Sequence, residues 1–106
     1  MNQGSPSDGA FDVPVSAEEA ARIEARCLRS DDGAGLSLIR WPKKQKEKLV
    51  LLRRIVGLFE NGRRYSENEV NALLSRLWAD HVMIRRYLID YRLLNRRPDG
   101  SQYWRP

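Results

Sequence analysis

Hydrophobic residues recur at helical spacing in three consecutive segments between residues 43 and 91. In the first segment they form an unusually broad stripe. Its members are Leu49, Leu51, Leu52, Ile55, Val56, Leu58 and Phe59. A stripe of this width indicates a helix that is covered on more than one side. We therefore predict that a helix from Lys43 to Glu60 forms the centre of the core, and that Asn61 and Gly62 end it.

The next two segments are predicted to be helices joined by a short turn. Ser66 and Glu69 have the spacing of a capping box at the start of the second helix, which runs to about Trp78. Asp80 is a good N-cap for a third helix, His81 to about Tyr91. The inner faces of the two helices comprise Val70, Leu73, Leu74, Leu77, Ile84, Tyr87, Leu88 and Tyr91. Two helices joined in this way have the geometry of a helix-turn-helix.

The chain after the third helix has the pattern of a β-hairpin. Residues 93–97 and 102–105 are predicted strands, because the sequence Pro98-Asp99-Gly100-Ser101 between them favours a turn. A short extended segment, Leu36 to Ile39, could pair with this hairpin as a third strand. The predicted fold is mainly α with a small β-hairpin, a winged helix-turn-helix made of a three-helix core plus a wing.

The first third of the chain has a different character. Residues 1–15 are rich in Gly, Ser, Asp and Pro, and we expect a disordered tail there. Ser16 opens a capping box before a predicted helix, Ala17 to Leu28, and residues 30–35 form a turn-rich linker. The chain is thus divided into residues 1–15, residues 16–35 and a winged-helix-like domain of residues 36–106. Cys27 is expected to lie outside the core of that domain.

Charge also distinguishes residues 1–35 from residues 36–106. The whole chain has 19 Lys and Arg against 14 Asp and Glu, a formal net charge of +5. Residues 36–106 hold 16 bases and 7 acids, whereas residues 1–35 hold 3 bases and 7 acids. A strongly basic segment implies a polyanionic partner, which is nucleic acid, an acidic protein surface or, as the weakest of the three, a membrane surface, unless the charge only keeps the protein soluble.

Several classes of protein are disfavoured by composition. Cys27 and His81 are the only cysteine and histidine, so the chain can form neither an internal disulfide nor a structural zinc site with four Cys or His ligands. Asp80 beside His81 is a weak acid–base pair without further catalytic partners. We therefore expect a binding protein without cofactor or metal, and not an enzyme. The absence of a signal-like start or long apolar run predicts a cytoplasmic protein outside the membrane.

The segment from Arg40 to Arg105 carries a set of residues that resembles a known bacterial family. The matching residues are Arg40-Trp41-Pro42-Lys43-Lys44, Tyr65-Ser66-Glu67, Glu69-Val70-Asn71, Arg85-Arg86-Tyr87-Leu88, Asp90-Tyr91, Leu93-Leu94, Asp99-Gly100-Ser101 and Tyr103-Trp104-Arg105. The segment resembles domain of unknown function 2087 over about sixty-five residues. The resemblance implies a transcription-related, winged-helix-like domain, found alone or joined to helix-turn-helix repressors. In this family Gly usually occupies the position of Arg92, where a left-handed residue would end the third helix.

Pairs of cations are the candidate nucleic-acid contacts. Arg85 and Arg86 are expected on the outer face of the third helix, the one that enters the major groove in helix-turn-helix proteins. Six further cations are candidates for phosphate contacts. They are Lys43 and Lys44 at the first helix start, Arg63 and Arg64 before a helix N-terminus, and Arg96 and Arg97 in the wing.

Two other partners remain open at this stage. Val82 and Ile89 share the outer face of the third helix and are poor DNA contacts. With the helix of residues 17–28, they could instead form a surface for a protein partner or a homodimer. RNA is also compatible with the basic patches, although the aromatic motifs of common single-strand RNA modules are missing.

Overall fold

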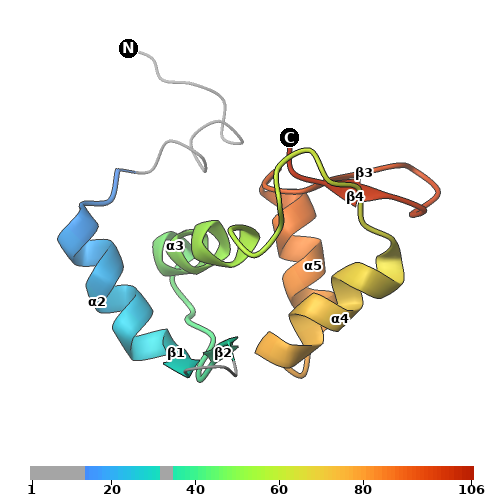
Figure 1. Ribbon diagram of the computed structural model, residues 1–106. Helices are drawn as coiled ribbons and strands as arrows, with labels where there is room; N and C mark the ends of the chain where they lie inside the picture. The colour runs from blue at the N-terminus through green and yellow to red at the C-terminus, as the bar shows by residue number, and fades with distance from the viewer. Residues whose placement is uncertain (1–13, 32–34) are drawn as a thin grey trace, which may run out of the picture.

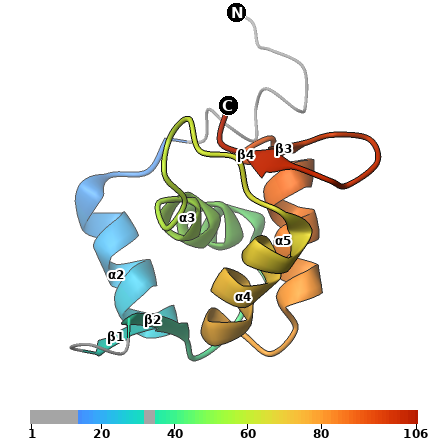
Figure 2. The same cartoon turned by 45° about the vertical axis from the view of Figure 1, so that its right-hand side comes forward.

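The computed structural model describes residues 14–31 and 35–106, so nearly all of the predicted tail lies outside the described residues. Helix α3 (Gln45–Val56) lies in the middle of the molecule (Figures 1 and 2). Helix α2 (Ala17–Cys27) covers one side of α3, and helices α4 (Glu67–Leu77) and α5 (His81–Asp90) cover the other. The chain is therefore mainly helical, as predicted.

The central position of α3 explains its broad apolar stripe. Four consecutive residues, Leu49 to Leu52, are all buried, which is only compatible with neighbours on several sides. The helix ends at Val56 and not at Glu60 as predicted, because Gly57 is a poor helix former. The chain then continues in tight turns, in which Phe59 N–H donates to Val56 C=O at 3.0 Å, so Phe59 still reaches the core.

The starts of α4 and α5 are fixed by the predicted caps. Ser66 Oγ accepts from the Glu69 N–H, and the Glu69 carboxylate accepts from the Ser66 N–H, so the capping box of α4 is complete. Asp80 Oδ1 accepts from the Met83 N–H at the start of α5. The inner faces of these helices join α3 in one buried cluster, through residues that include Val70, Leu74, Ile84 and Leu88. The three predicted helices thus share one core, and residues of α2 belong to it as well.

Helix α5 ends in a Schellman motif built on an arginine. Leu93 N–H donates to Leu88 C=O at 2.9 Å, and Arg92 N–H donates to Ile89 C=O at 3.0 Å. This pattern requires a left-handed residue between them, and Arg92 has a φ of 61°. The helix thus ends as it would with Gly, and Arg92 accepts the backbone strain that Gly would avoid.

Two separate hairpins lie at opposite ends of the molecule (Figure 1). Strands β3 (Asn95–Arg96) and β4 (Tyr103–Trp104) form the predicted C-terminal hairpin. Strand β2 (Gly35–Leu38) pairs with β1 (Leu28–Asp31), so its predicted pairing with the C-terminal hairpin is wrong. Strand β1 was not predicted, because its last residues fall in the segment that was predicted to be a linker. Strand β4 also pairs with Tyr65 in an isolated bridge. The Tyr65 N–H donates to the Tyr103 C=O, and the Tyr103 N–H donates to the Tyr65 C=O, both at 2.8 Å.

Helix α2 belongs to the same core as α3. Ile23 and Cys27 point inward and are 3% and 2% exposed, so the expectation that Cys27 lies outside the core is wrong. Burial raises the pKa of its thiol. Three ion pairs reinforce this contact. They are Glu19–Lys46 at 2.9 Å, Arg26–Glu47 at 3.2 Å and Glu24–Arg54 at 3.7 Å. The apolar face of α2 is therefore used inside this chain.

Within the described ranges, no helix has the length and apolar character needed to cross a bilayer.

Candidate nucleic-acid interface

The two arginines predicted on the outer face of α5 have different surroundings. Arg86 is exposed and has no hydrogen bond or ion pair within the described part of the chain. Arg85 lies against α4, where its Nη1 donates to Asn71 Oδ1 at 2.6 Å and is 3.7 Å from Glu67 Oε2. Only 18% of the Arg85 side chain is exposed. Arg85 therefore holds α5 to α4, and its predicted outward orientation is not observed.

A hollow of about 250 Å³ lies between α4, α5 and the C-terminal hairpin. It is lined by Glu67, Arg85, Arg86, Ile89, Asp90, Arg96 and Tyr103. Arg86 from α5 and Arg96 from β3 both reach this hollow, and neither is paired with another described residue. Glu67 is already engaged, because it faces Arg85 and accepts a hydrogen bond from the Tyr103 hydroxyl at 3.3 Å. The hollow thus brings together three predicted cations, of which Arg85 is engaged by α4 and the other two are not.

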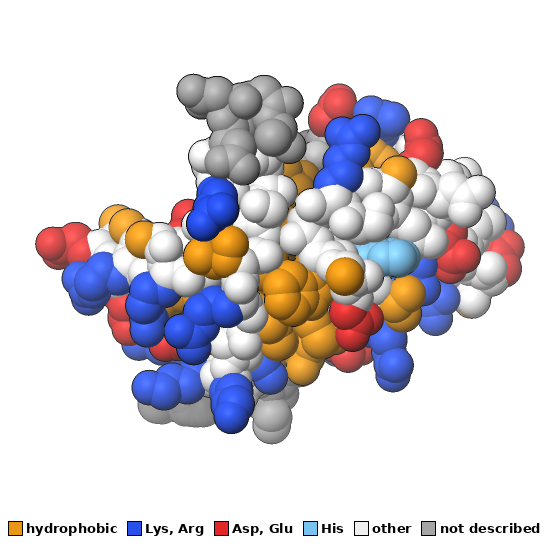
Figure 3. All heavy atoms as spheres, turned by 90° about the horizontal axis from the view of Figure 1, so that it is seen from below, with side chains coloured by type: hydrophobic (Ala, Val, Ile, Leu, Met, Phe, Trp, Pro, Cys, Tyr) orange, Lys and Arg blue, Asp and Glu red, His pale blue; other side chains and the backbone are white. Residues whose placement is uncertain are grey.

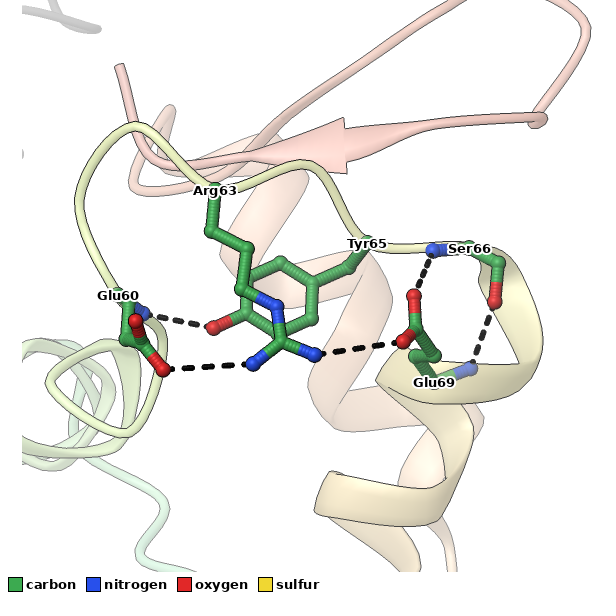
Figure 4. Close-up of polar contacts among 5 residues, drawn as sticks. All are labelled: Glu60, Arg63, Tyr65, Ser66 and Glu69. Carbon is green, nitrogen blue, oxygen red and sulfur yellow. Dashed lines mark hydrogen bonds and ion pairs between the residues drawn. The ribbon is translucent and has the colours of Figure 1, made fainter.

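Arg63 is held in a network of its own (Figure 4). Its Nη1 and Nη2 donate to Glu60 at 3.3 Å and Glu69 at 3.4 Å, and its guanidinium lies 4.6 Å from the Tyr65 ring centre. The Tyr65 hydroxyl in turn accepts from the Glu60 N–H at 2.8 Å. The pKa of Arg63 is raised, first by Tyr65 and then by Glu60 and Glu69. Arg63 thus fastens the loop between α3 and α4.

The network also occupies the helix N-terminus that the sequence offered as an anion site. The Glu69 carboxylate bonds the Ser66 N–H, and this bond, followed by the charge of Arg63, lowers the pKa of Glu69. A carboxylate of the protein itself therefore sits where an external anion was expected.

Arg64 points away from this network and stacks on Trp104. Its guanidinium carbon lies 3.9 Å from the Trp104 ring centre, and it makes no hydrogen bond or ion pair with any described residue. Arg97, on the hairpin, is 3.9 Å from Asp99 in the turn, and both side chains are more than half exposed. The pKa of Asp99 is lowered, mainly by hydrogen bonds from Ser101.

Lys43 and Lys44 precede α3 and are exposed. Lys44 is the N-cap residue of α3, yet its side chain makes no capping bond. The other lysines of this cluster are engaged, because Lys46 pairs with Glu19 and Lys48 Nζ donates to the Tyr87 hydroxyl at 3.3 Å. Lys43 and Lys44 therefore remain open to a partner, whereas the lysines that follow them stabilise the fold.

Apolar side chains lie next to Arg86 on α5. Val82 on α5 is 43% exposed, whereas Ile89 packs against the core, so only the first is an open apolar contact. A groove of about 470 Å³ along α5 is lined by Asp80, Val82, Met83, Arg86, Tyr87 and Asp90. Seen from below, hydrophobic side chains gather in the middle of the face, between a group of basic side chains and the one histidine (Figure 3).

Two supporting residues escaped the sequence reading. Asn71 accepts a hydrogen bond from Arg85, and Trp104 lies against the guanidinium of Arg64. Spacing along one helix or strand gives no sign of either contact, since each joins two elements. Among the residues that the structure describes, no group of three His, Cys, Asp or Glu could hold a metal ion.

The comparisons with known proteins give one result. No curated protein and no solved structure matches the chain. One family model does match, and it spans residues 37–105, which include α3, α4, α5 and the C-terminal hairpin. The chain therefore belongs to the family described as an uncharacterized protein conserved in bacteria, domain of unknown function 2087.

Proposed function

We propose that this protein is a winged helix-turn-helix domain that binds double-stranded DNA, in the manner of a transcriptional regulator. The order of elements supports the fold assignment. Helix α3 is followed by the bridging residue Tyr65, then by α4, α5 and the hairpin of β3 and β4. A winged helix has the same succession, in which the last helix of the core is the recognition helix.

The proposal rests on two cations that lie in the same hollow, come from two different elements and have no ion-pair partner among the described residues. Arg86 on α5 and Arg96 on β3 line one hollow, and neither has a partner among the described residues. A recognition helix and its wing contact DNA together, so cations left open at their junction are suited to the phosphate backbone. Lys43, Lys44 and Arg92 are further exposed cations, which do not line this hollow.

A binding measurement with matched charge loss tests the proposal. Fluorescence anisotropy with a short mixed-sequence DNA duplex, repeated over a range of salt concentrations, gives the affinity and its salt dependence. We expect Arg86→Ala with Arg96→Ala to weaken binding and to reduce the salt slope by about two, because each phosphate contact contributes about one. The control is Arg22→Ala with Arg29→Ala, which removes the same charge from α2 and β1.

The control variant should bind like the unchanged protein, and circular dichroism should show both variants folded. Equal effects of the two double variants would mean that only net charge matters, and would remove the site from the proposal. If the unchanged protein shows no salt-dependent binding to duplex DNA, the proposed function is refuted.

A second candidate function is a protein-interaction module on the same scaffold. Exposed Val82, in a groove with Met83 and Tyr87, favours it, because a DNA-reading helix has little use for an open apolar side chain at its start. Val82→Ser separates the two functions. If the groove binds a protein, this variant should abolish self-association or partner capture and leave DNA affinity nearly unchanged.

A further inference from the structure

Arg63 and Arg64 are consecutive residues that each place a guanidinium over an aromatic ring, but their surroundings differ. The guanidinium of Arg63 lies on the Tyr65 ring and that of Arg64 lies on the Trp104 ring. Because side chains alternate along an extended segment, the two point to opposite sides of the row that pairs with β4. Tyr65 and Tyr103 form that pairing, which puts Arg64 and Trp104 together on its other side.

The difference between the two arginines lies at the edges of their guanidinium groups. Arg63 uses its edge on Glu60 and Glu69 (Figure 4), whereas the edge of Arg64 bonds no described residue. Stacking on an indole covers one face of a guanidinium, but it leaves the five N–H donors in the plane. Arg64 is therefore a positively charged fork that lies against a ring and has unfilled hydrogen-bond donors, so part of the entropic cost of ordering it is already met within the fold.

We propose that the Arg64–Trp104 pair is a preformed contact for a phosphodiester group of DNA. This inference rests on the proposed function and adds a second anchor to it. A planar fork suits the oxygens of a phosphate, which it can bond bidentately. Trp104 and Tyr103 are successive residues of β4, so their side chains leave opposite faces of the hairpin. Arg96 pairs with Tyr103 in register, and the two cations therefore flank the hairpin from both sides.

This arrangement favours a nucleic-acid backbone over an acidic peptide. Phosphates recur along both strands of a duplex, so a hairpin lying against it meets acceptors on either side. The hollow on the Arg96 side and the stacked fork on the Arg64 side would then contact phosphates independently. A single acidic peptide segment would have to pass around the hairpin to fill both positions.

Three single variants test the inference by the same duplex titration. Arg64→Ala should weaken binding about tenfold and reduce the salt slope by about one. Arg63→Ala removes the same charge one residue away, and should leave affinity and slope unchanged in the folded protein. Trp104→Leu keeps every charge, so it should weaken binding while largely preserving the slope, because Arg64 no longer has the indole ring to lie against.

Nuclear magnetic resonance gives a readout that does not depend on affinity. The Arg64 side-chain N–H and Trp104 indole N–H signals should shift when the duplex is added, but not when an acidic peptide is added at equal ionic strength. Shifts with the peptide alone would assign the pair to a protein partner and overturn the inference. Arg64→Ala binding like Arg63→Ala would overturn it while leaving the proposed function intact, and a failure of the unchanged protein to bind the duplex would overturn both.

Discussion

The role of each arginine near the C-terminal hairpin follows from what meets the edge of its guanidinium. Arg63 and Arg85 bond side chains of neighbouring elements, so both stabilise the fold. Arg64 and Arg86 have no such bonds among the described residues and differ only in that Arg64 is stacked on a ring. Residue type alone does not separate these cases, because adjacent arginines in both pairs have opposite roles.

Arg92 is the residue at which backbone strain makes a testable difference. With a φ of 61°, it lies in the left-handed region, which costs a non-glycine residue roughly 1–2 kcal/mol. Glycine would remove this strain but gain freedom in the unfolded chain, which takes back about 0.5–1 kcal/mol. We expect Arg92→Gly to raise the free energy of unfolding by about 0.5–1 kcal/mol, measured by urea denaturation.

Arg92→Ala is the matched control, because it also removes the charge but keeps a Cβ atom. It should give no comparable gain in stability. If alanine stabilises the protein as much as glycine, charge repulsion and not the left-handed conformation is the source of the effect.

At the scale of elements, the sequence was sufficient to predict those features that depend on residues close together in the chain. The caps at Ser66 and Asp80 and the turn before Gln102 were all predictable, because each depends on residues a few positions apart. The partner of β2 was not predictable in this way. Pairing depends on which segment meets it in space, and the turn-forming residues around Gly33 masked the strand before them.

The candidate site was predictable only in part for the same reason. Sequence patterns placed Arg85 and Arg86 together on α5, but helical spacing alone cannot say which of two neighbouring positions faces α4. The acceptor on Asn71 lies fourteen positions earlier in the chain. Contacts between elements therefore decide which predicted cations stay available.

Helix α2 provides the prediction at this scale. Ile23 is 3% exposed at the contact between α2 and α3, so Ile23→Ala leaves a cavity in the common core. We expect the free energy of unfolding to fall by about 2–4 kcal/mol in urea denaturation. Arg22→Ala, at the neighbouring exposed position, should change it by less than about 0.5 kcal/mol. A small loss for Ile23→Ala would mean that α2 is only loosely attached and that residues 36–106 hold their fold alone.

At the scale of the whole molecule, the contact between α2 and α3 differs from the surface of α5 and the hairpin in how its charges are paired. The cations of α3 that face α2 are balanced by acids of α2, as Lys46 and Arg54 are by Glu19 and Glu24. On the other side, α5 and the hairpin expose arginines without partners among the described residues. Net charge alone would attract DNA to either side, whereas the proposed interface places close contact at α5 and the hairpin.

A change of charge on the α2 side distinguishes these two descriptions. Glu19→Gln with Glu24→Gln raises the net charge by two and releases Lys46 and Arg54 from their ion pairs. We expect a modestly faster association with duplex DNA at low salt, because the long-range field is stronger. The salt slope of the equilibrium affinity should stay the same, since it counts phosphates in contact and the proposed contacts lie at α5 and the hairpin. A slope steeper by about two would mean that Lys46 and Arg54 contact the backbone, and would move the interface to α2 and α3.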